Sequence, residues 1–202
     1  MSYHDVRSLP RAGAVLAASA LALCWPGSAA ADKAADFKEA AGNDGCKAIP
    51  FSSERNTCVD RSNEQRKVCK GFSCEKDVVV DDLDAYKEKT KKLQEAKQRN
   101  DEQGARGIEE ALKKLDDKLK GHVLEAKLRI DIAYDCLERR ERVQRSFSEA
   151  KEMVQKETDP LCQPYIPALV SKYDEGRQAH VGPMQEVTKA TDNCKWVATI
   201  SW

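Results

Sequence analysis

The spacing of apolar residues is most regular between Ile108 and Val154, where they recur every three or four positions. This is the period of an amphipathic helix, and the steps follow a heptad-like seam with one irregularity near Gly121. The seam consists of Ile108, Leu112, Leu115, Leu119, Val123, Ala126, Ile130, Ala133 and Leu137, and it continues through Val143, Phe147, Ala150 and Val154. The pattern therefore predicts one long helix over 108–154.

A second apolar stripe accompanies the seam in the middle of this helix. It comprises Leu124, Leu128, Ile132 and Cys136, each four residues after the one before. The two stripes together give a wide apolar face between Leu119 and Leu137. We expect the centre of the core there, with more than one neighbouring element in contact with it.

Weaker helical patterns lie on both sides of the long helix. They predict a short polar helix over 55–70, a helix from about 81 to 103 that ends at Gly104-Ala-Arg-Gly107, and C-terminal helices over 168–180 and 184–193. Residues 196–202 alternate apolar and polar side chains, which is a strand-like spacing. The predicted fold class is all-α: an elongated antiparallel helical bundle with long coiled-coil-like helices, held together by disulfides.

The first 31 residues have the pattern of a cleavable signal peptide. Arg7 and Arg11 precede an apolar run over 14–25, and small residues end the segment at Ala31. The run is shorter than the ~20 residues that span a bilayer. Cleavage before Asp32, or one residue earlier, is therefore favoured over a membrane anchor and over a lipoprotein modified at Cys24.

The mature chain, 32–202, is predicted to be a single helical domain. We expect it to contain a cysteine-rich part over 46–74, a long helical hairpin over 78–157, and C-terminal helices and a tail over 164–202. None of these segments is predicted to cross a membrane.

Seven cysteines remain in the mature chain: Cys46, Cys58, Cys69, Cys74, Cys136, Cys162 and Cys194. Export implies an oxidising compartment, so all seven are disulfide candidates, and the odd number leaves one over. If the hairpin turns near residue 105, Cys74 and Cys136 lie equally far from the turn. Cys74–Cys136 is therefore the preferred pair, with a small Cys69–Cys74 loop as the competitor.

Charge and motifs narrow the classes of function. The chain has 34 basic and 34 acidic residues, interleaved along the helices, whereas binding to nucleic acid requires a basic stripe. Neither C-x₂-C nor a glycine-rich phosphate loop occurs, and the mature histidines, His122 and His180, stand far apart in the sequence. We predict no catalytic residue, no metal site and no cofactor.

The sequence leads to the hypothesis of an exported, non-enzymatic binding or scaffolding protein that acts through helix faces in the cell envelope. The compartment would be the periplasm in a bacterium and the extracellular space otherwise. The partner is a protein that the sequence does not identify, and a homodimer is one option. The alternative is a small disulfide-rich helical inhibitor, or a carrier of a small apolar ligand, that binds through the cysteine-rich 46–74 part or at a groove or interface formed by Trp196, Ile200 and Trp202. An enzyme is the third hypothesis.

Overall fold

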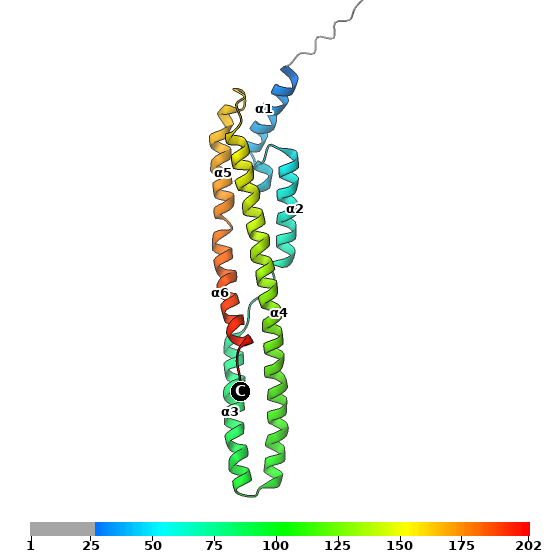
Figure 1. Cartoon of the computed structure of the whole chain (residues 1–202), viewed down its shortest axis with the longest axis vertical. Helices are drawn as coiled ribbons and strands as arrows, with labels where there is room; N and C mark the ends of the chain where they lie inside the picture. Colours follow the sequence, from blue (N-terminus) through cyan, green and yellow to red (C-terminus); the bar gives the residue numbers. More distant parts are fainter. Residues whose placement is uncertain (1–26) are drawn as a thin grey trace, which may run out of the picture.

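The computed structural model describes residues 27–202 and shows a rod of helices built on one long helix (Figure 1). Most of the predicted signal peptide, residues 1–26, lies outside the described part. The helices are α1 (Gly27–Ala41), α2 (Ser52–Val68), α3 (Lys76–Gln98), α4 (Glu102–Gln155), α5 (Ile166–Gln178) and α6 (Val181–Ala198), with short 3₁₀ helices η1 (Gly45–Ala48) and η2 (Gln163–Tyr165). Residues 27–202 contain no strand, which confirms the all-α prediction.

Helix α4 forms the spine of the rod. Its 54 residues span about 80 Å at ~1.5 Å per residue. The Asp101 side chain caps its first turn by accepting a hydrogen bond from the Gly104 amide at 2.8 Å. The helix is continuous through Gly121, so the predicted long helix is confirmed and begins earlier than expected.

The other helices cover different parts of α4. Helices α2 and α5 lie along its C-terminal half, α1 packs on α5 and the two 3₁₀ helices at the same end, and α6 continues the line of α5 (Figure 1). The segment 69–75 leaves the end of α2 and crosses to the side of α4 that α6 occupies, where α3 begins. Helix α3 then runs antiparallel to the N-terminal half of α4, and the chain ends beside it.

The buried side chains form three clusters along the rod rather than one core. The first joins α1, η1, α2 and α5 to the C-terminal half of α4, with Phe37, Ile49 and Tyr173 fully buried. The second joins α3, α4 and α6 through Val79, Leu83, Leu119, Ala126, Cys194 and Val197. A small third cluster between them contains Ala133, Cys136 and Val187.

Two predicted chain breaks are wrong in position. The hairpin turns at residues 99–101, not at Gly104–Gly107, because the Asp101 cap starts α4 before the glycines. The break between the two C-terminal helices, expected between residues 180 and 184, lies at Ala179 and His180, and Gly182 and Pro183 belong to the first turn of α6. Proline in a first helical turn removes an amide that has no acceptor there, so Pro183 is accommodated at the start of α6.

The wide apolar face of α4, which was expected to contact more than one neighbouring element, is only partly covered by other helices. Leu124 is 68% exposed and Leu128 is 60% exposed, whereas the seam residues Leu119, Ala126 and Ala133 are buried. The reason is the course of segment 69–75. Helix α2 stops at Val68 and the chain crosses to the opposite side, so no helix lies over the leucines.

No helix within residues 27–202 combines the length and the apolar character that are needed to cross a bilayer.

Candidate functional site

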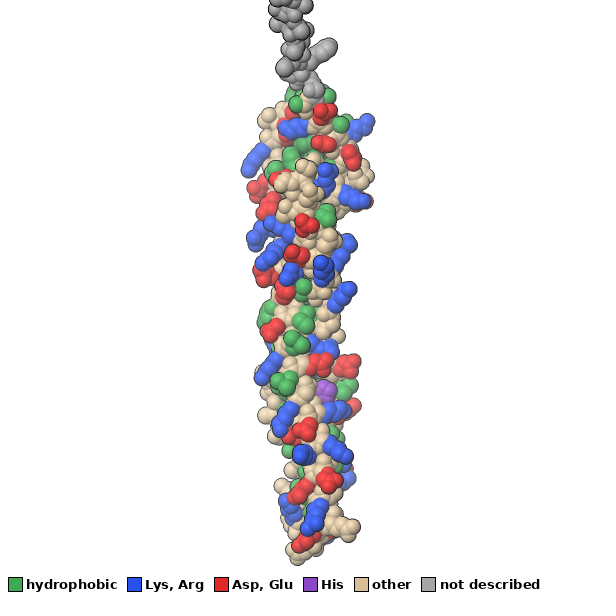
Figure 2. All heavy atoms as spheres, turned by 90° about the vertical axis from the view of Figure 1, so that its right-hand side faces the viewer, with side chains coloured by type: hydrophobic (Ala, Val, Ile, Leu, Met, Phe, Trp, Pro, Cys, Tyr) green, Lys and Arg blue, Asp and Glu red, His purple; other side chains and the backbone are tan. Residues whose placement is uncertain are grey.

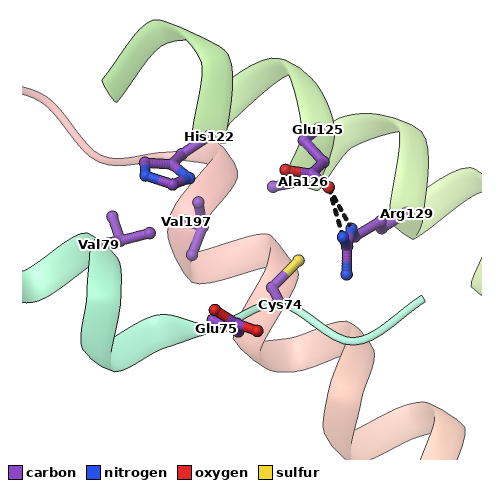
Figure 3. Close-up of a pocket in the computed structure, with 8 residues that line it drawn as sticks. All are labelled: Cys74, Glu75, Val79, His122, Glu125, Ala126, Arg129 and Val197. Carbon is purple, nitrogen blue, oxygen red and sulfur yellow. Dashed lines mark hydrogen bonds and ion pairs between the residues drawn. The ribbon is translucent and has the colours of Figure 1, made fainter. Parts of the chain in front are cut away.

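A pocket of ≈ 270 Å³ lies at mid-length, where the start of α3, the middle of α4 and the end of α6 meet (Figure 3). Its lining residues come from all three helices and from the segment that precedes α3. They are Cys74, Glu75, Val79, His122, Glu125, Ala126, Arg129 and Val197. The pocket therefore depends on contacts between parts of the chain that are far apart in sequence.

One wall of the pocket carries an ion pair within α4. Arg129 and Glu125 are one helical turn apart, and their side chains meet (Figure 3). Arg129 also donates a hydrogen bond to the backbone oxygen of Ser73, which fixes the segment that leads into α3. The disulfide between Cys74 and Cys194 closes the same region by joining this segment to α6.

A polar cluster on the neighbouring turn holds His122 in place. The Asp82 carboxylate, only 8% exposed, accepts hydrogen bonds from Lys118 Nζ at 2.8 Å and from His122 Nε2 at 3.1 Å. Burial acts to raise the pKa of Asp82, but the hydrogen bonds from Lys118 and His122 outweigh it, and the pKa is lowered. Asp82 therefore remains ionised and ties α3 to α4 beside the pocket.

The lining combines charged side chains with a small apolar surface. It contributes two carboxylates, one guanidinium and one imidazole, with apolar contact from Val79, Ala126 and Val197. No hydroxyl lines it, and its one sulfur, that of Cys74, is in a disulfide. Across the described range 27–202, no three His, Cys, Asp or Glu side chains are placed to hold a metal ion.

The disulfides are Cys46–Cys58, Cys69–Cys136 and Cys74–Cys194, so the preferred pair Cys74–Cys136 is wrong. The error follows from the hairpin turn, which lies about five residues earlier than expected. Because residues 69–75 are not helical, the rise of ~1.5 Å per residue that the prediction assumed does not apply to them. Cys69 therefore lies level with Cys136, at a Cα–Cα distance of 4.9 Å, while Cys74 has already crossed to α6.

Cys162 is the unpaired cysteine of the described part, and its side chain is fully buried in the first cluster. Burial raises the pKa of the Cys162 thiol, and the nearby carboxylates of Asp159 and Glu157 act in the same direction. A thiol in such surroundings reacts slowly, because the thiolate is the nucleophile.

The predicted groove residues Trp196, Ile200 and Trp202 are all partly buried against the second cluster. Trp202 Nε1 donates a hydrogen bond to Asp116 Oδ1 at 2.9 Å, and Lys76 Nζ lies 4.8 Å from the centre of the Trp196 ring. These three residues do not line the pocket. The expected strand-like tail is wrong, because α6 continues to Ala198 and residues 199–202 form no strand.

Sequence reasoning singled out only part of this site. It placed Ala126 on the apolar seam, noted His122 only as one of two histidines of the mature chain, and named Cys74 as a disulfide candidate. It did not identify Glu75, Glu125 and Arg129, since a charged side chain on a long polar helix gives no sign of the pocket that it lines. The spacing of four between Glu125 and Arg129 was the one available signal.

The fold and the pocket define a disulfide-bridged rod of helices with a polar pocket at its middle. Comparison with known proteins finds no family model, no curated protein and no solved structure that matches this chain.

Proposed function

We propose that this is an exported, non-enzymatic binding or scaffolding protein of the cell envelope that acts through a helix face. The observation that carries the proposal is the uncovered face of α4. Leu124 and Leu128 lie one turn apart on this face, and they are 68% and 60% exposed. Figure 2 shows one side of the rod, on which apolar side chains gather at mid-length among charged ones.

The uncovered face continues an existing interface. Nearer its C-terminus, α4 packs against α2, and Cys69–Cys136 marks the end of that contact. Ile132, partly buried, follows Cys136 toward the N-terminus, and Leu128 and Leu124 come next at the same spacing of four. Single exposed leucines are ordinary on protein surfaces. Two in consecutive turns, in line with a packed helix, form the surface that a further amphipathic helix would cover.

The occupant we propose is the same face of a second copy, lying antiparallel. Toward the N-terminus the stripe through the leucines carries Lys113, Asp117 and Lys120, and toward the C-terminus it carries Asp131, Asp135 and Glu138. Lys120, Asp135 and Glu138 also pair within α4, with Asp116, Arg139 and Arg142, so an antiparallel arrangement sets a mixed, mainly acidic end against the lysine-containing end of the other copy. Antiparallel pairing also makes the contact isologous, as in most homodimers.

We expect the mature protein to associate reversibly, with a Kd of about 10–100 µM because the apolar part of the face is small. Leu124→Lys combined with Leu128→Lys should leave a monomer at all concentrations, since it places four like charges in the contact. Sedimentation velocity between about 5 and 500 µM measures this. The thermal midpoint should stay unchanged, because both side chains are exposed in the monomer.

Leu161→Lys is the matched control. Leu161 is 55% exposed but lies in the turn after α4, away from the stripe. This variant should associate like the wild type. A wild-type protein that is monomeric over the whole range, or an equal effect of Leu161→Lys, would contradict the proposed face.

The proposed export leads to a separate prediction about the number of free thiols in the purified protein. Three disulfides support an oxidising compartment. If the protein is exported and cleaved near Asp32, the purified protein should show no thiol that reacts with a disulfide reagent in the native state and one, Cys162, after denaturation. Intact mass spectrometry should give a chain that begins at Asp32 or Ala31. Two thiols after denaturation would show that Cys24 is retained, and more would show that the disulfides do not form.

A further inference from the structure

The junction of α5 and α6 consists of Ala179, which ends the first helix, and His180, which precedes the second. Both sides of this junction are anchored. Tyr173 of α5 is fully buried in the first cluster, and Cys194 of α6 is bonded to Cys74. Any loosening at the junction is therefore confined to the residues between these anchors, and the rod as a whole stays intact.

His180 contacts α4 at this junction through Arg140. Arg140 Nη1 lies 3.5 Å from His180 Nδ1, a long hydrogen bond in which the guanidinium donates and the imidazole accepts. Within residues 27–202 the Arg140 side chain has no other hydrogen-bond partner, and its Nε is buried without one. A guanidinium keeps its positive charge at all ordinary pH values. The contact therefore requires that His180 Nδ1 carries no proton.

Protonation of His180 replaces this contact with repulsion. A protonated imidazole has a proton on each ring nitrogen, so Nδ1 no longer accepts a hydrogen bond. Two positive charges then face each other in a partly buried place, where solvent screens them less than at the surface. Burial lowers the pKa of His180, and the charge of Arg140 lowers it further, below the usual 6.5 of an imidazole.

The charged groups on the neighbouring helices do not neutralise a proton on His180. On α6, Glu186 is close enough to favour the charged form of Arg140, but burial outweighs it and the pKa of Arg140 is lowered. On α5, the charged side chain in the last turn is Arg177, another cation. The charge that acts on His180 from α4 is that of Arg140 itself.

The elements on the other side of His180 supply no free carboxylate either. His180 lines a cleft of ≈ 410 Å³ together with Asp44, with Lys47 of η1 and with Arg66 of α2. Asp44 is the one acidic residue of this lining, and it is paired with Lys172 at 2.6 Å. A proton on His180 therefore adds to a surrounding that is already positive.

We propose that the junction of α5 and α6 is a pH-sensitive hinge, in which protonation of His180 separates it from Arg140 and releases the first turns of α6 from α4. The released stretch ends near Val187, which packs in the third cluster. The closed junction has the lower pKa, so its stability is complete above 6.5 and is lost as the pH falls toward the pKa of the closed state. The hinge is separate from the uncovered face of α4, so either proposal can fail without the other.

Hydrogen exchange of the purified protein at about pH 5 and about pH 7.5, corrected for the intrinsic chemical rate, tests the hinge. The lower pH protonates an imidazole and leaves most carboxylates ionised. The Met184 amide donates to the His180 backbone oxygen at 3.0 Å and is the most direct reporter. Amides over 184–187 should lose protection about tenfold at the lower pH, because a pKa lowered by one unit favours opening by that factor. Amides over 169–176 and 190–197 should be equally protected at both.

Two variants assign the effect to the contact. His180→Gln keeps a neutral acceptor for Arg140 and should abolish the pH effect over 184–187. Arg140→Gln removes the facing charge, so the pH effect should fall below about threefold. The pKa of His180, followed by NMR of its ring protons, should then rise toward 6.5. A merely structural role of Arg140 would not change this pKa in that direction.

His122→Gln is the matched control. His122 is the other histidine of the described chain, and it faces the Asp82 carboxylate instead of a cation. This variant should keep the full pH effect over 184–187.

Equal protection of 184–187 at the two pH values in the wild type would overturn the proposal, as would a pH effect that persists in His180→Gln. A loss of protection that spreads evenly over 169–176 and 190–197 would contradict it too, because acid would then unfold the rod rather than open a hinge. An unchanged pKa of His180 in Arg140→Gln would show that the two side chains are not coupled.

Discussion

Replacing both Cys74 and Cys194 by serine is expected to lower the free energy of unfolding by about 5 kcal/mol, the largest loss from any single disulfide. The two residues are separated by 120 positions, so their bond removes more freedom from the unfolded chain than a short loop does. The bond also joins α6 to the segment before α3, where it forms part of the pocket wall. Denaturation in guanidinium chloride, followed by circular dichroism and tryptophan fluorescence, measures the loss.

The Cys46–Cys58 pair provides the internal comparison. Its cysteines are only 12 positions apart, so the same double replacement should cost about 3 kcal/mol. Trp196 and Trp202 both pack in the second cluster, beside Cys194, and therefore report on that end of α6. If removal of Cys46–Cys58 costs as much as removal of Cys74–Cys194, the long connection is not the main constraint on this fold.

Tyr173→Ala should be the most damaging single substitution in the first cluster, with a loss of about 3–5 kcal/mol. Tyr173 has the largest fully buried side chain, and its hydroxyl donates a hydrogen bond to the Ala48 backbone oxygen at 2.7 Å. Burial raises the pKa of Tyr173, so the hydroxyl keeps its proton over the usual pH range. The side chain therefore fills the space between α5 and η1 and also satisfies a backbone carbonyl.

Tyr173→Phe separates these two contributions. It keeps the ring and removes the hydroxyl, and it should cost about 1–2 kcal/mol because the Ala48 oxygen loses its partner. Thermal unfolding of the two variants beside the wild type measures both effects. A loss in Tyr173→Phe as large as that in Tyr173→Ala would mean that the hydrogen bond, rather than the packing of the ring, dominates at this position.

The cluster around Tyr173 also depends on a close approach of two helices. An added Cβ at Gly176 would lie 3.0 Å from the nearest ring atoms of Phe147, tighter than ordinary contact. The missing side chain lets α5 lie against α4 at this level. The sequence signal for it was only one glycine inside a helical pattern, which gives no sign of the partner.

Helix content and most of the extent of α4 followed from the sequence alone, because a period of three to four residues is a local property of the chain. The packing partners of each apolar residue did not. Leu124 and Leu128 fit the helical period as well as Leu119 does, yet only Leu119 is buried. The difference arises from where α2 ends and which side of α4 the next segment takes, and the pattern within α4 holds no information on either.

For the cysteines too, the sequence determined one part of the outcome and the packing of the chain determined the other. Their number was read from the sequence and their oxidation was expected from the predicted export, and three disulfides are present. Their pairing depended on a hairpin turn, which the Asp101 cap moved by a few residues, and on the course of the non-helical segment 69–75 across α4. The pocket and the cleft are further removed from sequence, since each is assembled from three or more elements. Periodicity fixes which side of a helix is apolar, but only the packed chain decides which helix, solvent or ligand meets that side.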